Sequence, residues 1–395
     1  MSPQHLPECP RVFIQYNCIP HYRECIFRLL SATRDVAFTV IADSHSDTPF
    51  LRTMPSATQQ GVRHLEASTR RVNIPGCPTL YWQPEALRLV ARHRPDSVIA
   101  LGSVYSLTAW CLCLYGRWKH IPVLLWGHGL LAQERGIKWW IRRMLYKLAA
   151  GHLLYGDHAR QLLLAQGFSA ETLHVVYNSL NYDSQMAIAD QLDGSRCHEW
   201  RRRLGVQLGE RVVVFTGRLE PQKRLDLLFE AMARLRKKGR HIHAVLIGEG
   251  RERQALEALA QQSGLRDRAH FLGEHYDEEL LGLVLTSSDL CVIPSAAGLS
   301  VMHAFVFGTP VLLHDRHELH GPEWEAVSEG KTGFFYRYGD VDHMSAQIEQ
   351  ALFPAPRKMQ MAADCQAVVR ERYNPYRQVE WFKQAIRSTL RQQAA

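Results

Sequence analysis

The chain has 395 residues, a length that predicts two domains. Its residues are 46% apolar and 22% charged, which is typical of a soluble globular protein. Its 47 lysines and arginines exceed its 39 aspartates and glutamates, and the net charge of +8 suits polyphosphate ligands or an anionic membrane surface. Nine scattered cysteines without a CxxC pair argue against a zinc site or a disulfide framework. The N-terminus lacks a basic start followed by a long apolar core, so no secretory signal is expected.

Short apolar or β-branched runs alternate with amphipathic helical stretches through the first half of the chain. The expected strands are 12–17, 37–43, 97–102, 122–129, 152–156 and 174–178. Strands that alternate with helices predict parallel βαβ units. The longest apolar run, 97–115, contains polar Ser103, Ser106 and Thr108, and we interpret it as a buried strand and helix and not as a membrane span.

The same alternation restarts after a polar interval at 181–209. Further strands are expected at 211–217, 243–248, 270–273, 290–295 and 310–315, a glycine-rich turn at 325–336 and an amphipathic helix at 375–393. The predicted fold is α/β, with two doubly wound Rossmann-like domains that face a central cleft. We expect an N-terminal domain at 1–190, a C-terminal domain at 205–375, and a helix at 376–395 that packs toward the first domain.

A basic pair follows the first strand of the second half. Arg218 comes directly after Gly217, and Lys223 precedes an amphipathic helix. An arginine can bind two oxygens at once, a lysine supplies a point charge, and the helix dipole adds to both. The spacing therefore suits a diphosphate, and a solvated basic turn is the alternative.

The stretch IPSAAGLSVMHAFVFGTPV, 293–311, predicts a buried strand, a turn at Gly298, a helix through His303 and a second strand. Ser295 and His303 are the side chains best able to reach a ligand there. The backbone amides of residues 297–299 open the helix, and we expect them to be available to phosphate or sugar oxygens.

The order of strands, glycine turns and helices over about 210–352 resembles the C-terminal domain of the retaining family-four nucleotide-sugar glycosyltransferases, which have the two-domain GT-B fold. The resemblance rests on FTGRLEPQKRLDLL (215–228), GEG (248–250), HFLGEH (270–275) and EAVSEGKTG (325–333), and it extends more loosely over the first half. It implies sugar transfer with retention, without a protein nucleophile and without a bound metal.

The resemblance assigns roles to several residues of the second half. It implies that Arg218 and Lys223, beside Gly217, bind the donor diphosphate and stabilise its charge as the sugar leaves. Leu272 and Gly273 match the loop that meets the nucleotide base.

The stretch at 293–311 departs from the family, which carries two glutamates separated by seven residues where this chain has Ser295 and His303. A glutamate accepts two ribose hydroxyl protons, whereas a neutral histidine offers one acceptor and one donor. The chain resembles a subgroup with a Gly-Leu-Ser/Thr-x-x-His pattern, here beginning at Gly298 and Leu299, which implies that His303 is a working donor residue. A hydrogen-bonded core histidine is the alternative.

Two later glutamates could supply the carboxylates that this stretch lacks. Glu325, five residues before Gly330, matches an acidic residue of the family, and Glu323 lies two residues earlier. Both would lie near the donor if the loop at 314–327 folds back over it. Chance acidic residues in a loop are the alternative.

In the first half, His128 lies between two glycines at the end of an expected strand. The family has a histidine here, held near the sugar and the leaving phosphate, and a core histidine is the alternative. The family's Gly-Gly pair in the first strand-to-helix loop is replaced by residues 19–23. There, His21 and Arg23 could face the donor phosphate or an acidic acceptor, and the alternative is an ordinary helix start with Arg23 in solvent.

The stretch IKWWIRRMLYKLA, 137–149, combines tryptophans and aliphatic residues with Lys138, Arg142, Arg143 and Lys147. A basic amphipathic helix of this kind suits a lipid interface. The alternative is that its apolar face docks on its own sheet.

Together these features predict a retaining, metal-independent, cofactor-free hexosyltransferase that moves a sugar from a nucleotide-diphosphate sugar to a glycan or lipid-linked acceptor. The expected setting is bacterial surface polysaccharide biosynthesis (lipopolysaccharide, capsule or exopolysaccharide). We expect a cytoplasmic protein with peripheral contact to the inner membrane surface and no nucleic-acid partner. A non-catalytic GT-B partner subunit and a nucleotide-sugar epimerase on the same fold are the alternatives.

Overall fold

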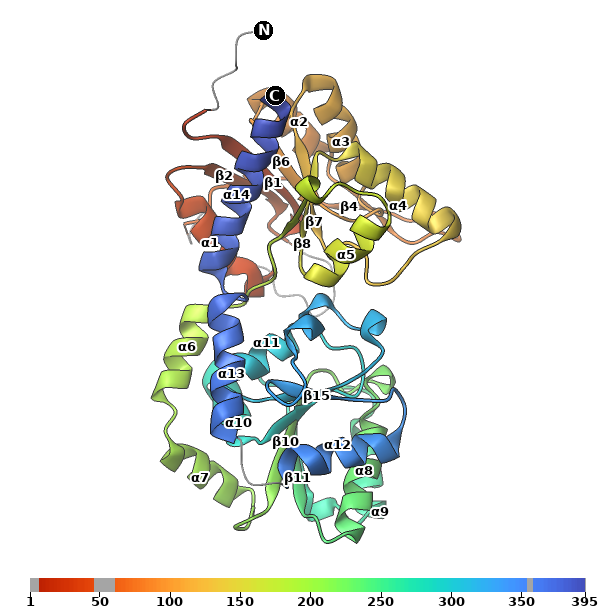
Figure 1. The fold of residues 1–395 in the computed structure, drawn as a ribbon, viewed down its shortest axis with the longest axis vertical. Helices are drawn as coiled ribbons and strands as arrows, with labels where there is room; N and C mark the ends of the chain where they lie inside the picture. The colour runs from red at the N-terminus through yellow and green to blue at the C-terminus, as the bar shows by residue number, and fades with distance from the viewer. Residues whose placement is uncertain (1–6, 46–60, 354–357, 395) are drawn as a thin grey trace. The chain divides into compact units, whose positions relative to one another are not determined.

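A computed structural model describes residues 7–45, 61–353 and 358–394, and in it the chain forms two compact units (Figure 1). The first unit comprises the residues up to Asn181 together with those from Asn374 onward, and the second is Tyr182–Tyr373. None of the helices within the described ranges is long and apolar enough to cross a membrane.

The first unit is built on a seven-stranded parallel sheet with the order β3-β2-β1-β6-β7-β8-β9. Its strands are β1 (Arg11–Cys18), β2 (Ala37–Asp43), β3 (His64–Glu66), β6 (Ser97–Leu101), β7 (Val123–Gly127), β8 (Gly151–Leu154) and β9 (Leu173–Val175). The order reverses between β1 and β6, and a doubly wound sheet binds its ligands at the carboxyl ends of strands at such a point.

Helices cover both faces of this sheet because successive residues of a strand point to opposite sides. Val12 and Ile14 of β1 join a buried cluster with Phe27 and Phe382, whereas Phe13 joins the cluster on the other face. The helices are α1 (Glu24–Ala32), α2 (Pro84–His93), α3 (Leu107–Lys119), α4 (Gly136–Leu148), α5 (Asp157–Ala165) and α14 (Pro375–Ala394), and β4 (Arg70–Val72) pairs antiparallel with β5 (Leu80–Trp82).

The second unit holds a six-stranded parallel sheet with the order β12-β11-β10-β13-β14-β15. Its strands are β10 (Arg211–Thr216), β11 (Ile242–Ile247), β12 (Ala269–Gly273), β13 (Leu290–Val292), β14 (Val311–His314) and β15 (Gly333–Tyr336). Its helices are α6 (Tyr182–Gln191), α7 (Gly194–Arg203), α8 (Leu225–Lys237), α9 (Arg253–Gln262), α10 (Glu278–Ser287), α11 (Ser300–Val306), α12 (Val341–Leu352) and α13 (Lys358–Glu371). The two sheets confirm the predicted α/β, doubly wound fold.

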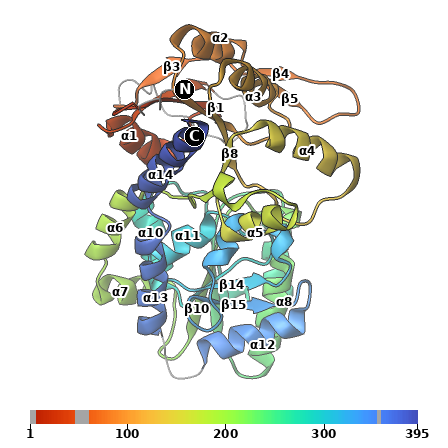
Figure 2. The same cartoon turned by 45° about the horizontal axis from the view of Figure 1, so that its top comes forward.

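The edge strand β15 corrects the prediction of a glycine-rich turn over 325–336. It pairs with β14 along its whole length, and Figure 2 shows the two strands side by side. Gly333 is required there because a Cβ atom would lie 2.4 Å from the carbonyl oxygen of Val311. The strand has only four residues, and the glycines at 330 and 333 make its sequence look like a turn.

The units also divide the chain differently from the predicted domains, which ended at 190 and restarted at 205. Helices α6 and α7, over 182–203, belong to the second unit because they pack on α10, and α6 also packs on α11. Helix α14 belongs to the first unit, where Phe382 and Ile386 are fully buried in the cluster that contains α1.

Candidate functional site

Three glycines lie at the carboxyl ends of neighbouring strands of the second unit. Gly217, Gly248 and Gly273 follow or end β10, β11 and β12, with φ of 144°, 145° and 83°. A Cβ atom on Gly248 would lie 1.9 Å from the Gly217 carbonyl oxygen. The Gly248 amide donates to the Gly273 carbonyl at 2.7 Å. Because these glycines have no side chains, the main chain of neighbouring strands packs closely at this edge of the sheet, and a ligand can approach that main chain.

Arg218 and Lys223 lie on the turn between β10 and α8. The residues Pro221–Lys223 form a 3-10 turn, in which the Lys223 amide donates to the Glu220 carbonyl at 2.8 Å. Arg218 is exposed and Lys223 is half-buried. Burial, and then the positive charge of Arg218, lower the pKa of Lys223. An anion bound between two such cations would relieve their mutual repulsion.

The acidic neighbours of this pair are engaged by other arginines. Glu220 accepts a hydrogen bond from Arg251 at 2.9 Å, and Asp226 accepts from Arg224 at 2.9 to 3.1 Å. Within the described ranges, Lys223 forms no salt bridge with a carboxylate. The ammonium charge of Lys223 is therefore not neutralised by a carboxylate among these residues.

The predicted base loop follows β12 at the same edge. The Nε2 atom of His275 lies 2.9 Å from the Leu272 carbonyl oxygen, which folds the loop into a tight turn. Glu249, held by Arg253, has a carboxylate oxygen 3.3 Å from where a Cβ atom on Gly273 would lie. The loop thus presents main-chain groups and polar side chains beside the glycines.

The loop after β13 is clamped from two sides. The Pro294 carbonyl accepts a hydrogen bond from the Tyr336 hydroxyl at 2.7 Å, and the Ala297 carbonyl accepts one from the Gly321 amide at 2.7 Å. The Ala297 amide donates to His320 Nδ1 at 3.0 Å. The expectation that this amide is available to a ligand is therefore wrong, because His320 already uses it.

His320, which accepts the hydrogen bond from the Ala297 amide, is stacked on a second histidine, His314. The rings of His314 and His320 lie 4.0 Å apart, the Arg316 amide donates to His314 Nδ1 at 3.2 Å, and His320 Nε2 lies 2.9 Å from the His314 carbonyl oxygen. Because each Nδ1 accepts a backbone N–H, both rings carry their proton on Nε2 when neutral. Burial lowers the pKa of both residues, that of His314 to about 4.

Glu323 lies against the same loop. It is only 2% exposed, and its Oε2 atom lies 4.0 Å from the position of a Cβ atom on Gly298 and 2.8 Å from one on Gly321. The segment after β14 therefore lies against Ala297 and Gly298, in the loop that precedes α11. Glu325 lies on the same 3-10 turn, Pro322–Ala326, and is half-buried.

His303 and Ser295 have different surroundings. His303 Nδ1 lies 3.2 Å from Nε2 of Gln185, a buried residue of α6 that also donates to Glu278 at 3.1 Å. The Gln185 amide makes His303 Nδ1 an acceptor and places the ring proton on Nε2. Ser295 Oγ is buried and has no hydrogen-bond partner among the described residues.

In the first unit, Arg23 lies in a cage of aromatic rings. Its guanidinium carbon lies 4.8 Å from the Trp126 ring centroid, 5.2 Å from that of Tyr155, and under 6 Å from those of Tyr16 and Tyr22. Its Nη2 atom donates to the Tyr155 hydroxyl at 2.8 Å. Arg23 is only 4% exposed, so the alternative that places it in solvent is wrong.

His128 lies next to this cage, on the turn after β7. Its ring meets the Tyr155 ring edge-on at 5.0 Å between centroids. Desolvation, and then the charge of Arg23, lower the pKa of His128, which favours the neutral imidazole. Gly129 has φ of +67° and lies against β8 and α5, so the turn is closely fitted. His21 is exposed on the loop between β1 and α1.

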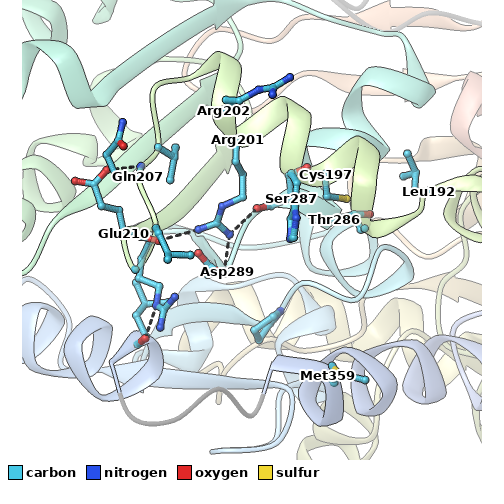
Figure 3. Close-up of a pocket in the computed structure, with 18 of the residues that line it drawn as sticks. Leu192, Cys197, Arg201, Arg202, Gln207, Glu210, Thr286, Ser287, Asp289 and Met359 are labelled. Atoms are coloured by element: carbon cyan, nitrogen blue, oxygen red, sulfur yellow. Dashed lines mark hydrogen bonds and ion pairs between the residues drawn. The ribbon is translucent and has the colours of Figure 1, made fainter.

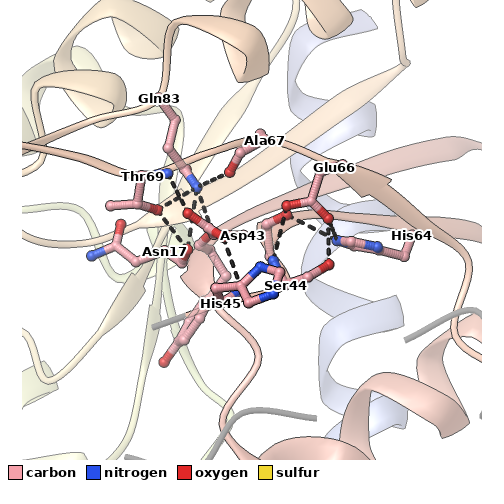
Figure 4. A network of polar contacts seen from close by, with 11 residues as sticks. Asn17, Asp43, Ser44, His45, His64, Glu66, Ala67, Thr69 and Gln83 are labelled. Atoms are coloured by element: carbon pink, nitrogen blue, oxygen red, sulfur yellow. Dashed lines mark hydrogen bonds and ion pairs between the residues drawn. The ribbon is translucent and has the colours of Figure 1, made fainter. Parts of the chain in front are cut away.

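A polar network ties together the carboxyl ends of β1, β2 and β3 (Figure 4). The Gln83 amide nitrogen donates to the Ala67 carbonyl at 3.0 Å and to the Thr69 hydroxyl at 2.9 Å. Asp43 accepts from the Thr69 amide at 2.6 Å, and Glu66 accepts from the Ser44 amide at 2.9 Å. These carboxylates are used to hold loops in place.

Comparison with protein families assigns both halves of the chain. Residues 25–184 match the family described as "Glycosyltransferase Family 4", and residues 198–364 match "Glycosyl transferases group 1". The chain is a GT-B glycosyltransferase of these families. The predicted resemblance to the GT-B glycosyltransferases is therefore confirmed at the level of the family.

Curated relatives of this glycosyltransferase align over part of their length. An alpha-D-kanosaminyltransferase and a 2-deoxystreptamine glucosyltransferase of Streptomyces kanamyceticus are 25% and 28% identical over 60% and 66% of this chain, and 59% and 65% of their own length. A D-inositol 3-phosphate glycosyltransferase of Nocardia farcinica is 36% identical over 35% of this chain and 32% of its own. The chain thus spans from about a third to under two thirds of these relatives.

Solved structures share the fold at low sequence identity. HepE of Anabaena in complex with UDP matches with a TM-score of 0.70 and 18% identity, over 96% of this chain and all of that one. The lipopolysaccharide outer core galactosyltransferase WaaB matches with a TM-score of 0.67 and 14% identity, over 96% and 99%.

A hollow of about 740 Å³ lies elsewhere in the second unit of this glycosyltransferase (Figure 3). Its lining includes Arg201 of α7, which pairs with Asp289 at 3.1 Å, and Arg211, the first residue of β10. Asp289 directly precedes β13, so the hollow is at the amino ends of the strands. Because doubly wound sheets bind nucleotides at the opposite edge, we do not assign the donor to this hollow.

The predicted site residues of the second half lie at the carboxyl ends of the strands of the second unit's sheet. Those of the first half lie at the carboxyl ends of the strands of the first unit's sheet. The predictions missed Gln185 and His320, which hold His303 and the Ala297 amide. Gln185 lies in a polar interval that looks like a linker. The only available signal for His320 was the histidine-rich HDRHELH at 314–320.

Proposed function

We propose that this glycosyltransferase moves a sugar from a nucleotide-diphosphate sugar to a glycan or lipid-linked acceptor. The observation that carries the proposal is the pair of Arg218 and Lys223 at the carboxyl end of β10, at the point where the strand order reverses toward β13. A diphosphate leaving group develops negative charge as its bond to the sugar breaks, and two fixed cations stabilise that charge.

The donor proposal is supported by neighbours of the same fold that were solved with UDP and with UDP-glucose. In this chain, the base would meet the loop at Leu272 and Gly273, the diphosphate would lie over Arg218 and Lys223, and the ribose would meet His303. Glu323 lies buried against Gly298. A glutamate so placed would fix the loop and accept hydrogen bonds from a bound sugar.

We further propose that transfer proceeds with retention and without a metal. The cation pair would do the work that a divalent metal does on a diphosphate elsewhere. Neutral His128 would hydrogen-bond to the sugar, because its lowered pKa disfavours the imidazolium form. The proposed setting is surface polysaccharide assembly from cytoplasmic nucleotide sugars, supported by the likeness to a lipopolysaccharide galactosyltransferase.

A thermal-shift screen against UDP, GDP, dTDP, ADP and their sugars tests the donor proposal. A true donor at a hundred times its Kd should stabilise the protein by about 2.7 kcal/mol. Arg218→Ala should weaken that donor by roughly ten- to a hundredfold, since it removes a charge-assisted contact. Lys237→Ala, an exposed substitution on α8, serves as the matched control.

Product analysis then separates the proposal from its alternatives. NMR spectroscopy of the product should show the donor's anomeric configuration, with a rate unchanged by a metal chelator. Free epimerised sugar without any glycan product would instead identify an epimerase. Failure of every nucleotide to bind would identify a non-catalytic partner subunit.

A further inference from the structure

Helix α4 exposes a row of large apolar side chains. Ile137, Trp140, Ile141 and Met144 are 71%, 58%, 40% and 43% exposed. Their positions follow the i, i+3, i+4, i+7 spacing of one helix face. Large side chains scattered singly over a surface are ordinary, but a continuous row indicates contact with a partner.

This row is not the face with which α4 packs on its own unit. Leu145 and Tyr146 are buried, and Trp139 packs on the same core cluster from the inner side of the helix. The two interpretations of the 137–149 stretch are therefore compatible. One face of α4 docks on the sheet, and a second apolar face remains exposed.

Helix α3 extends the exposed surface. It lies beside α4 in both views, and Arg117 at its end donates to the carbonyls of Lys147 and Leu148 at 2.6 and 3.1 Å (Figure 1, Figure 2). Leu114 and Trp118 of α3 are 54% and 69% exposed. We define the α3–α4 face as these two residues together with Ile137, Trp140, Ile141 and Met144.

The segment that carries this face is strongly basic. Between 107 and 149 the sequence has seven lysines and arginines and one acidic residue, a difference of +6 within a chain whose total is +8. The single acid, Glu134, is held by Arg142 at 2.7 Å and by Lys138 at 3.4 Å. Among the described residues, neither Arg143 nor Lys147 forms a salt bridge with a carboxylate.

We propose that the α3–α4 face binds the surface of a membrane rich in anionic lipids. Apolar side chains with two tryptophans suit the boundary between headgroups and acyl chains, and the basic residues around them match anionic headgroups. Charge also decides against a second copy of the chain, because pairing this face with itself would bring two basic segments together. The α4 part of the face begins nine residues after His128, so the face would hold the first unit's candidate site close to lipid-linked molecules.

Vesicle co-sedimentation of the full-length protein tests the proposal. Binding should be strong to vesicles of phosphatidylcholine with about one third phosphatidylglycerol, and at least tenfold weaker to phosphatidylcholine alone. Raising the salt from 0.1 to 1 M shortens the Debye length from about 10 to about 3 Å and should release most of the protein.

Two pairs of variants separate the apolar and basic contributions. Trp118→Ser with Trp140→Ser should weaken binding to anionic vesicles by about tenfold or more. Arg143→Gln with Lys147→Gln should weaken it by about fivefold for each charge removed. The matched controls are Leu208→Ser with Met359→Ser and Arg202→Gln with Lys237→Gln, all exposed in the second unit, and they should bind like the unaltered chain.

The outcomes are distinct from those of the donor tests, because these variants leave Arg218 and Lys223 intact. Nucleotide-induced thermal shifts that match the unaltered chain would show that each variant is folded. Equal binding to neutral and anionic vesicles, or undiminished binding by both test pairs, would overturn the proposal. A concentration-dependent dimer that the tryptophan variant abolishes, without vesicle binding, would assign the face to a second copy instead.

Discussion

In each sheet an arginine follows the strand at which the strand order reverses, but the two arginines have opposite surroundings. Arg218, after β10, is exposed beside Lys223, whereas Arg23, after β1, is enclosed by four aromatic rings. Both positions lie where the strand order reverses. The same topology therefore supports a cation offered to a ligand and a cation held within the protein, and the neighbouring side chains decide which.

The largest effect that separates the two arginines concerns stability. Arg23→Ala should lower the free energy of unfolding by about 2–4 kcal/mol, because it opens a cavity among the rings and removes the cation–π contacts. Arg23→Met should cost less, since it refills the volume without a buried charge. Chemical denaturation measures both, with Arg218→Ala as the control for an exposed position. Equal losses for all three would contradict the contrast.

The next largest effect concerns Lys223, the neighbour of the exposed Arg218. Lys223→Met should weaken donor binding by roughly ten- to a hundredfold and raise the melting temperature without ligand. The sign follows because the folded state lowers the pKa of Lys223, so the charged form is less favourable folded than unfolded. Differential scanning fluorimetry with and without donor measures both. A variant that loses stability and keeps its affinity would remove Lys223 from the donor site.

His320 should contribute next, because it satisfies the Ala297 amide. His320→Ala should cost about 1–2 kcal/mol of unfolding free energy and weaken donor binding, whereas exposed His198→Ala should do neither. Since burial lowers the pKa of His314 and His320, the unfolded chain takes up more protons than the folded one below pH 6.5. Stability should therefore fall from pH 6.5 to 5, and less steeply in the His320 variant. An unchanged slope would contradict this account.

The smallest effects concern the two positions where the resembled family has glutamates. His303→Ala should weaken donor binding by about five- to tenfold, the value of roughly one hydrogen bond. Ser295→Ala should change it less than twofold, because the buried hydroxyl that it removes has no hydrogen-bond partner in the part of the chain that the structure describes. Isothermal titration with the donor measures both. A larger loss from Ser295→Ala than from His303→Ala would reverse the assignment.

Local sequence patterns predicted an element correctly where the residues of that element contained the pattern themselves. The apolar run of β10, Gly217 and the amphipathic α8 place Arg218 and Lys223 at a strand end without any tertiary information. The same reasoning missed β3, β4 and β5, which have only three residues each, and β3 and β4 also contain charged residues that interrupt an apolar pattern. The predicted bounds placed most of α6 in the first domain and α7 between the domains, because the packing of both helices on α10 cannot be seen in their own residues.

What the sequence alone determined was the alternation of strands and helices, the basic pair after Gly217 and the family resemblance, since each depends on residues close together in the chain. Only the tertiary structure decided that His320 takes the Ala297 amide, that Gln185 holds His303 from more than a hundred residues away, and that rings on β1, on β7 and directly after β8 lie around Arg23. Hydrogen-bond partners and burial depend on which segments the fold brings together, and that long-range information is absent from any short stretch of sequence.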